Sequence, residues 1–394
     1  MIKAYIKEIR KNFKDGASFD YLSQENIEHA IEFHRCFNEY KPTPLVKLLN
    51  LSENLGISSI YVKDESFRFG LNAFKVLGGS YAIGMYLAEK LEKHIEDIDF
   101  NYLSSDKVKK RLGEITFVTA TDGNHGRGVA WAAKRLGHKC VVYMPKGSSK
   151  TRLSNIKAEG AEAFIIDGNY DDAVRLSDEM SKKRGWVVIQ DTAWVGYEKI
   201  PTWIMQGYGT IMKEIMIQIK EKPSHVFLQA GVGSFAAAMI GCLLSEYDDD
   251  YPLIYIIEPE KADCIYRSIV AGKIEKVDGD MNTIMAGLAC GEPNTISWDI
   301  IRDYSDGALS CSDEVTALGM RILGNPIKDD VKIISGESGA LGMGILYSVM
   351  KKKEFEEIKE KLKLDEDSSV LIISTEGDTD PENYRDLVWC VEKG

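Results

Sequence analysis

Most of this chain repeats one order of segments: a short apolar run, a turn, often glycine-rich, and a stretch with helical spacing. EITFVTA at 114–120 leads into TDGNHG, and HVFLQA at 225–230 leads into GVGSF. Similar strands or strand-and-turn units lie at 141–162, 163–184, 186–220, 253–260, 331–350 and 369–384. Parallel strands need crossover connections, usually helical and right-handed. The order therefore predicts an α/β fold with two open, mostly parallel sheets flanked by helices.

The segments before residue 113 flank one further motif, at residues 63–80. Apolar residues recur at helical spacing in 24–37, and a proline-containing entry at 41–48 precedes a helix that ends at Gly56. SSIYVKDES is a short β-rich run, and a long helical pattern follows Gly79 before a charged connector to about Gly113. We therefore expect a strand to deliver the chain to the stretch KDESFRFGLNAFKVLGGS at 63–80.

Composition excludes several classes of partner. The 394 residues are 44% hydrophobic and 28% charged, with a net charge of −12, and an acidic protein repels nucleic-acid phosphates and anionic membranes. No stretch of about 18 apolar residues occurs, and the amino-terminal segment lacks the apolar core of a signal peptide. We expect a cytoplasmic protein that binds neither nucleic acid nor membrane.

The seven cysteines have no CxxC spacing, so they indicate neither a disulfide framework nor a zinc site. Cys264 and Cys290 lie among small residues and could approach one another, which leaves a bridge between them open.

Lys75 lies in an apolar segment with glycines on both sides. Partial desolvation lowers the pKa of an amine and frees it as a nucleophile, so Lys75 is a candidate Schiff-base lysine. The alternative is a surface lysine at the start of a helix.

Three turns follow predicted strands, where open α/β sheets bind ligands. In the first, residues 231–235, successive glycines let backbone N–H groups converge on an anion, although tight turns also favour glycine for steric reasons. The chain has neither GxxxxGK[ST] nor a GxGxxG with an acidic residue about twenty positions on. A single phosphate group therefore fits this turn better than ATP or NAD.

The second turn, TDGNHG, comprises residues 121–126. Its backbone amides could hold a substrate carboxylate, while Asn124 offers an amide to a phenolic oxygen and Asp122 faces the ligand. The alternatives are a plain helix cap and, for His125, a packing role. The third turn, STEGDTD, comprises residues 374–380 and presents a serine hydroxyl that can meet a ring nitrogen, unless it is only a turn of good turn formers.

Together these pieces resemble the fold-type II pyridoxal-phosphate enzymes, and most closely the diaminopropionate ammonia-lyase family. The likeness runs from PTPLVKL to TEGDTDPENY. It includes QDTAWVGYEKIPTWIMQGY, MAGLACGEPNTISWDI and SGESGALG, and NAFK combined with TDGNHG is its most discriminating part. The broader family has serines where Ala73 and Asp122 stand here.

The resemblance implies a role for each matched residue. Lys75 binds the pyridoxal 5'-phosphate covalently, and Asn124 contacts its phenolic oxygen. The phosphate lies on Gly231, Val232, Gly233 and Ser234. Ser374, with Thr375 as second choice, meets the pyridine nitrogen. Asp122 and Asp191 are the active-site acids, and the substrate-binding set is Thr121, Asp122, Gly123, His125 and Asp191.

The implied reaction is elimination of ammonia from D- and L-2,3-diaminopropionate, which gives pyruvate and a second ammonia. Alternatives are a serine or threonine dehydratase, a non-catalytic metabolite-binding protein and a nucleotide-dependent oxidoreductase. The resemblance also implies a homodimer. We expect a large discontinuous domain, 1–62 and 163–394, and a small inserted domain, 63–162, with the cofactor between them.

Overall fold

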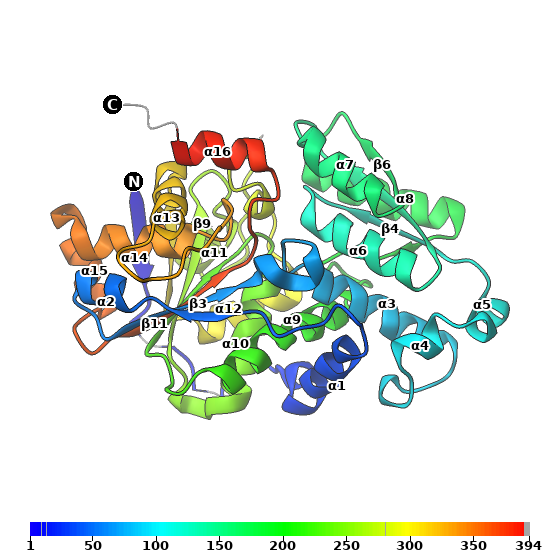
Figure 1. Cartoon of the computed structure of the whole chain (residues 1–394), viewed down its shortest axis with the longest axis horizontal. Coiled ribbons are helices and arrows are strands. Elements are labelled where there is room, and N and C mark those ends of the chain that lie inside the picture. The colour runs from blue at the N-terminus through cyan, green and yellow to red at the C-terminus, as the bar shows by residue number, and fades with distance from the viewer. Residues whose placement is uncertain (9, 13, 280, 390–394) are drawn as a thin grey trace. The chain divides into compact units, whose positions relative to one another are not determined.

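The computed structural model describes residues 1–8, 10–12, 14–279 and 281–389, and divides the chain into two compact units (Figure 1). Unit 1 comprises Met1–Phe19, Thr43–Phe67 and Glu214–Gly394, and unit 2 comprises Asp20–Pro42 and Arg68–Lys213. Within the described ranges, no helix is both long and apolar enough to cross a membrane.

Unit 1 is built on a seven-stranded sheet in the order β1-β10-β9-β8-β11-β3-β2. Its inner five strands are parallel, and β1 and β2 pair antiparallel at the two edges. The strands are β1 (Ile2–Ile6), β2 (Leu45–Lys47), β3 (Ser59–Asp64), β8 (His225–Gln229), β9 (Leu253–Pro259), β10 (Gly307–Cys311) and β11 (Ser369–Ser374). Every residue of β3, β8, β10 and β11 is buried, as expected for strands covered on both faces.

The helices of unit 1 follow these strands along the chain. They are α2 (Leu49–Leu55), α10 (Ser234–Tyr247), α11 (Cys264–Ala271), α12 (Thr295–Tyr304), α13 (Asp313–Gly324), α14 (Leu341–Lys351), α15 (Glu356–Leu362) and α16 (Pro381–Trp389). As expected, α2 ends at Gly56, whose φ of +73° favours glycine. Cys264 and Cys290 are both free thiols.

Unit 2 contains a parallel four-stranded sheet in the order β6-β5-β4-β7. Its strands are β4 (Thr116–Ala120), β5 (Lys139–Met144), β6 (Glu162–Ile165) and β7 (Val187–Val188). Its helices are α1 (Gln24–Arg35), α3 (Val76–Lys90), α4 (Phe100–Leu103), α5 (Asp106–Leu112), α6 (Asn124–Arg135), α7 (Lys150–Ala158), α8 (Tyr170–Arg184) and most of α9 (Lys199–Gln218).

The predicted α/β architecture with two mostly parallel sheets is confirmed, but two local predictions are wrong and two strands were missed. The strand expected at the start of 331–350 does not form, and Val331 is instead 58% exposed. The charged connector before Gly113 contains α4 and α5. Two strands were not predicted: β1, in the amino-terminal segment, and β10, whose sequence GALSC has no β-branched residue to signal a strand.

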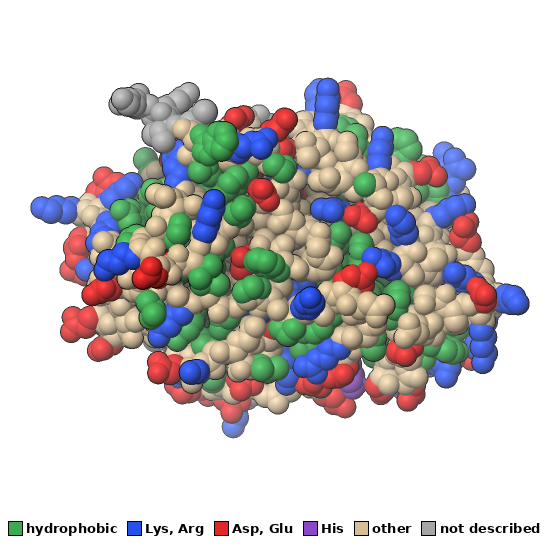
Figure 2. Space-filling model, in the orientation of Figure 1, with side chains coloured by type: hydrophobic (Ala, Val, Ile, Leu, Met, Phe, Trp, Pro, Cys, Tyr) green, Lys and Arg blue, Asp and Glu red, His purple; other side chains and the backbone are tan. Residues whose placement is uncertain are grey.

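The compact units also differ in extent from the expected domains. Residues 20–42 and 163–213 belong to unit 2, and 63–67 belong to unit 1. Residues 163–213 belong to unit 2 because β7 pairs with β4 in the small sheet, so the chain up to α9 stays with that sheet. Figure 2 shows acidic and basic side chains interspersed over the face that it draws, so the acidic excess is not gathered there into one patch.

Candidate active site

Lys75 directly precedes α3 in unit 2, where it is the N-cap residue, with its side chain 19% exposed. Its Nζ atom forms an ion pair with Oδ2 of Asp191, and it lies 5.5 Å from the ring centroid of Phe74 and 5.8 Å from that of Tyr208. The lysine is therefore held between a carboxylate and two aromatic rings, which contradicts the alternative of a plain surface lysine.

Asp191 follows β7, and its side chain is only 4% exposed. Burial alone would raise the pKa of this carboxyl group, but the charge of Lys75 and its hydrogen bond hold the pKa well below the ordinary value. Tyr208 interacts with both members of the pair, and burial raises the pKa of its hydroxyl group. Asp191 is thus an ionised carboxylate at neutral pH.

Gln190 fixes the segment that carries Asp191. Its Oε1 accepts hydrogen bonds from Oγ1 of Thr119 and from the backbone N of Ala120, both at 2.9 Å. Its Nε2 donates to the hydroxyl of Tyr170 at 2.7 Å. Because both ends of the amide are used, the chain after β7 is tied to the end of β4.

The TDGNHG turn joins β4 to α6. A Cβ atom on Gly128 in α6 would lie 2.7 Å from the Cα of Val76, the residue after Lys75, so only glycine permits this approach of α6 to α3. His125 is buried at the start of α6, and its Nε2 lies 2.8 Å from the carbonyl oxygen of Ile189. This contact ties the turn to the segment that carries Asp191.

The imidazole of His125 lies among charged groups. Burial lowers its pKa, while the charges of Asp191 and Asp122 raise it and that of Lys75 lowers it. The carbonyl partner requires the proton on Nε2, so Nδ1 is an acceptor, and it has no hydrogen-bond partner among the described residues. These couplings place Lys75, Asp122, His125 and Asp191 in one neighbourhood of unit 2.

Asp122 does not act as the side-chain cap of α6, because the N-cap position is Gly123 and no side chain caps this helix. Its Oδ2 lies 3.1 Å from Nη1 of Arg152, a residue of α7 that is 6% exposed. A Cβ atom on Gly123 would lie 2.9 Å from Cδ of Arg152, so the arginine stem packs against the turn. The plain helix-cap alternative for Asp122 is therefore excluded.

The glycine turn at 231–234 lies in unit 1, between β8 and α10. Gly233 has φ of +96°, and a Cβ atom there would lie 2.8 Å from Cδ1 of Ile265. A Cβ atom on Gly231 would lie 3.1 Å from Sγ of Cys290. Backbone amides at the N-terminus of a 14-residue helix, with no Cβ in front of them, form a cradle suited to an anion.

Ser374 and Thr375 lie at the end of β11, beside β8. Ser374 is fully buried, and its Oγ donates to Oγ of Ser335 at 2.7 Å. Nε2 of Gln229 donates to the carbonyl of Ile373 at 2.8 Å and to Oγ1 of Thr375 at 3.2 Å. Since Oγ1 of Thr375 accepts that bond, its own proton is directed elsewhere.

The donor set fits the phosphorylated, nitrogen-containing ring that the resemblance implies. Within unit 1, the glycine turn suits a phosphate and the hydroxyl of Thr375 suits a ring nitrogen. Within unit 2, the amine of Lys75 suits covalent attachment of an aldehyde. Oε1 of Gln229 and Oγ of Ser338 are buried without hydrogen-bond partners in the described part of the chain. These are polar atoms for which a bound group would provide contacts.

The sequence did not identify several residues that build this neighbourhood. Gln190, Arg152 and Tyr208 are buried polar or aromatic side chains from separate elements, and no local spacing links them to Lys75. Gln190 and Tyr208 did lie inside the matched segment QDTAWVGYEKIPTWIMQGY, which was their only signal, and Arg152 lay in none of the matched segments.

Comparison with known proteins agrees with this geometry. The family model described as pyridoxal-phosphate dependent enzyme matches residues 37–376. The diaminopropionate ammonia-lyase of Salmonella typhimurium (strain LT2) is 51% identical over 396 residues, covering 99% of this chain and 98% of that protein. Two crystal structures of the Escherichia coli diaminopropionate ammonia lyase are 48% identical in sequence, and each match covers 99% of this chain and 97% of the other.

One of these structures holds an aminoacrylate-PLP azomethine reaction intermediate and has a TM-score of 0.91. The other is a complex with D-serine and has a TM-score of 0.92. The match extends over nearly the whole length of both chains, so its span includes the lysine stretch and all three turns. This chain belongs to the family of pyridoxal-phosphate dependent enzymes and, within it, to the diaminopropionate ammonia-lyases.

Proposed function

We propose that this protein is a carbon–nitrogen lyase that eliminates ammonia from 2,3-diaminopropionate and yields pyruvate and a second ammonia. The observation that carries the proposal is the Lys75–Asp191 ion pair beside the Asp122–Arg152 pair, since together they provide an amine and two carboxylates in one neighbourhood. When bound, pyridoxal 5'-phosphate supplies the electron sink that makes the Cα proton acidic.

The residues proposed to hold the cofactor are those that the family resemblance implies. Lys75 binds it covalently through Nζ, and Asn124 contacts its phenolic oxygen. Gly231, Val232, Gly233 and Ser234 hold the phosphate. For the ring nitrogen we favour Thr375 over Ser374, because Oγ1 of Thr375 accepts from the amide Nε2 of Gln229, whereas the hydroxyl of Ser374 is paired with that of Ser335.

The substrate carboxylate is proposed to lie on the backbone amides at the start of α6. Thr121, Gly123 and His125 belong to this turn, and the positive end of a 12-residue helix favours an anion there. Because the proton on His125 Nε2 is committed to Ile189, the Nδ1 acceptor is the atom that can receive a hydrogen bond from substrate.

Protons are proposed to leave Cα on two opposite faces. Lys75 acts as the base for one enantiomer and Asp122 for the other. Asp191 plays a different part, since a carboxylate with a depressed pKa is a poor proton donor but a good partner for a cation. It keeps the β-amine of the substrate protonated. When the bond from Cβ to this nitrogen breaks, the nitrogen takes the bonding electrons and leaves as neutral ammonia.

Two carboxylates also favour 2,3-diaminopropionate over the hydroxyl substrates of a serine or threonine dehydratase, which remains the second candidate. A hydroxyl leaving group needs no negative partner, and buried carboxylates disfavour it by comparison with an ammonium group. The tomato threonine deaminase structure is only 19% identical to this chain and supports the fold alone.

The test measures pyruvate formation from D- and L-2,3-diaminopropionate and from L-serine with the wild type, Lys75→Ala and Asp122→Asn. We expect turnover of both diaminopropionate isomers, loss of both with Lys75→Ala, and a larger loss on the D isomer with Asp122→Asn. Equal or faster turnover of serine would favour the dehydratase. Equal loss on both isomers with Asp122→Asn would overturn the two-face assignment.

We also propose that the protein is a cytoplasmic homodimer. The family resemblance supports this proposal. Light scattering coupled to gel filtration would give twice the 44.1 kDa chain mass for a dimer, and a value near 44.1 kDa would contradict it.

A further inference from the structure

The segment GEPNTISW, residues 291–298, belongs to the matched sequence but has no role in the reaction proposed above. It contains Asn294, which is fully buried in unit 1 and directly precedes α12. The backbone N of Asn294 donates to the carbonyl of Val232 at 2.7 Å, and its Nδ2 donates to Oγ of Ser234, also at 2.7 Å. One residue thus contacts the glycine turn twice.

The orientation of the Asn294 amide is fixed by the helix that it caps. Its Oδ1 accepts a hydrogen bond from the backbone N of Ile296 at 3.1 Å, as an N-cap oxygen does. The other end must therefore be the NH₂ group, which can only donate, so Ser234 is the acceptor in the bond between them. The bond between Asn294 and Ser234 therefore does not use the proton of the Ser234 hydroxyl.

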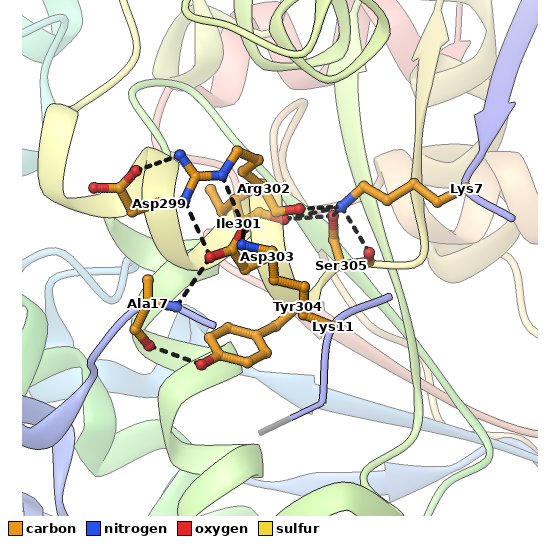
Figure 3. A network of polar contacts seen from close by, with 9 residues as sticks. All are labelled: Lys7, Lys11, Ala17, Asp299, Ile301, Arg302, Asp303, Tyr304 and Ser305. Atoms are coloured by element: carbon orange, nitrogen blue, oxygen red, sulfur yellow. Dashed lines mark hydrogen bonds and ion pairs between the residues drawn. The ribbon is translucent and has the colours of Figure 1, made fainter. Parts of the chain in front are cut away.

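Helix α12, which Asn294 caps, is itself held by contacts with the glycine turn and with the amino-terminal segment. A Cβ atom on Gly233 would lie 3.5 Å from Cβ of Ser297 in the first turn of the helix and 3.0 Å from Cδ1 of Ile301 further along it, so the helix packs against the glycine turn. At the end, Nζ of Lys7 donates to the carbonyl oxygens of Arg302 at 2.7 Å and of Ser305 at 2.8 Å (Figure 3). The last turn of α12 is thereby tied to the amino-terminal segment.

A second set of contacts strengthens the same end of the helix. Asp303 accepts hydrogen bonds from the backbone N of Ala17 at 2.9 Å and from Nε of its neighbour Arg302 at 2.8 Å (Figure 3). The hydroxyl of Tyr304 donates to the carbonyl of Ala17 at 2.7 Å. A helix fixed at its far end can present its cap residue to the glycine turn with little freedom.

We propose that Asn294 is a positioning residue of the phosphate site, which sets the hydroxyl of Ser234 as a donor toward the cofactor phosphate. This inference rests on the proposed cofactor site. The proposed role needs no direct contact between Asn294 and the phosphate. Its effect is transmitted by the bond to Ser234 and by the carbonyl of Val232, which it keeps turned away from the anion.

The test compares the affinity of each apoenzyme for pyridoxal 5'-phosphate with its affinity for pyridoxal, because the ratio isolates the phosphate. In Asn294→Ala we expect the phosphate-dependent ratio to fall about tenfold, as for loss of a hydrogen bond to a charged group, with pyridoxal affinity unchanged. Asn294→Asp retains the cap acceptor but adds a carboxylate, so its ratio falls further, and the ³¹P resonance of the bound phosphate shifts.

The control variant is Asn169→Ala. Asn169 is the N-cap of α8 and accepts from the backbone N of Asp172 at 3.0 Å, so this variant loses a cap in unit 2 without touching the glycine turn. Its ratio should equal that of the wild type. Asn294→Asp, which keeps the cap, guards against a misfolded alanine variant, and a cooperative thermal transition identifies the folded protein.

Ser234→Ala separates the inference from the site on which it rests. A reduced ratio in both single variants, with no further loss in the double variant, supports the proposal. A reduced ratio in Ser234→Ala alone, or equal losses of both ligands in Asn294→Ala, overturns the positioning role. An unchanged ratio in both variants overturns the phosphate site itself.

Discussion

Oδ2 of Asp122 lies 3.1 Å from Nη1 of Arg152, and the stem of that arginine packs against Gly123 in the same turn. The pair holds the carboxylate in one orientation and offsets its charge. If Asp122 is the base for the D isomer, Arg152→Met should lower kcat/KM for D-2,3-diaminopropionate about tenfold or more, since orientation of a base contributes at least that factor. Turnover of the L isomer should change less than about threefold.

Arg152→Lys is the matched control, because it keeps the charge and loses the planar donor geometry. Steady-state kinetics with each enantiomer measure the effect. A loss of the same size on both isomers, with Asp122→Asn still selective, would show that Arg152 supports the turn in general rather than the base.

The Lys75–Asp191 pair predicts a pH dependence of stability in the apoenzyme. The pKa of Asp191 is held below its ordinary value of 3.8, so the unfolded state binds the proton more tightly than the folded state. The stabilising contribution is complete above pH about 5 and is lost as the pH falls through and below 3.8. Asp191→Asn should therefore cost about 2 kcal/mol at pH 7 and progressively less in acid.

Urea unfolding of the apoenzyme at pH 7, 5, 3.5 and 3 measures this difference, because the last two values lie below the ordinary pKa of 3.8. The exposed residue Asp367 provides the control, since Asp367→Asn should leave the wild-type pH dependence intact. An Asp191→Asn variant with a constant stability difference across this range would contradict the ion-pair explanation.

Gly128 should tolerate alanine poorly. The added Cβ would lie 2.7 Å from Cα and 2.8 Å from N of Val76, and backbone atoms cannot rotate away. Gly128→Ala should destabilise the protein by about 2 kcal/mol or more and lower kcat by displacing the helix that follows Lys75. Gly79→Ala, also within a helix, meets a methyl group of Val129 first, at 3.1 Å, and should cost less.

Thermal unfolding and kcat measured for the two glycine variants check this order. Alanine is intrinsically the better helix residue at both positions, by about 1 kcal/mol, so any gain from that source is common to the pair. A Gly128→Ala variant as stable as Gly79→Ala would contradict the close approach of α6 and α3.

Substitutions of Thr375 and of Ser374 should have different effects on the cofactor ring. Thr375→Val removes the hydroxyl whose proton is not donated to Ser335, so we expect it to shift the absorption maximum of the bound cofactor and weaken its binding about tenfold. Thr375→Ser should restore both. A larger spectral shift in Ser374→Ala than in Thr375→Val would reverse the assignment.

The sequence was informative wherever a periodic pattern and a turn coincided. The β4 and β8 units show this, since each strand, turn and helix lies where the apolar run and the glycines predict it. It was misleading at 331–335, where an apolar run finds no neighbouring strand. It gave no signal for β10, which is a strand because its neighbours β1 and β9 pair with it.

The sequence predicted the site residues that lie in short motifs, but not the residues that hold those motifs in place. Lys75 and Asp122 lie in short stretches whose residues carry their own signal. Arg152 and Asn294 act through contacts with residues 30 and 60 positions away, and only the folded chain brings these partners together.

The chain is divided in a way that affects how such an enzyme can change over time. Unit 1 is assembled from three separate stretches of the gene product and unit 2 from two, and one border falls between Phe67 and Arg68, inside the stretch that carries Lys75. No single crossover between related genes can therefore exchange one intact unit for another. Exchange of one intact unit would require crossovers at every border between the segments, at 19/20, 42/43, 67/68 and 213/214.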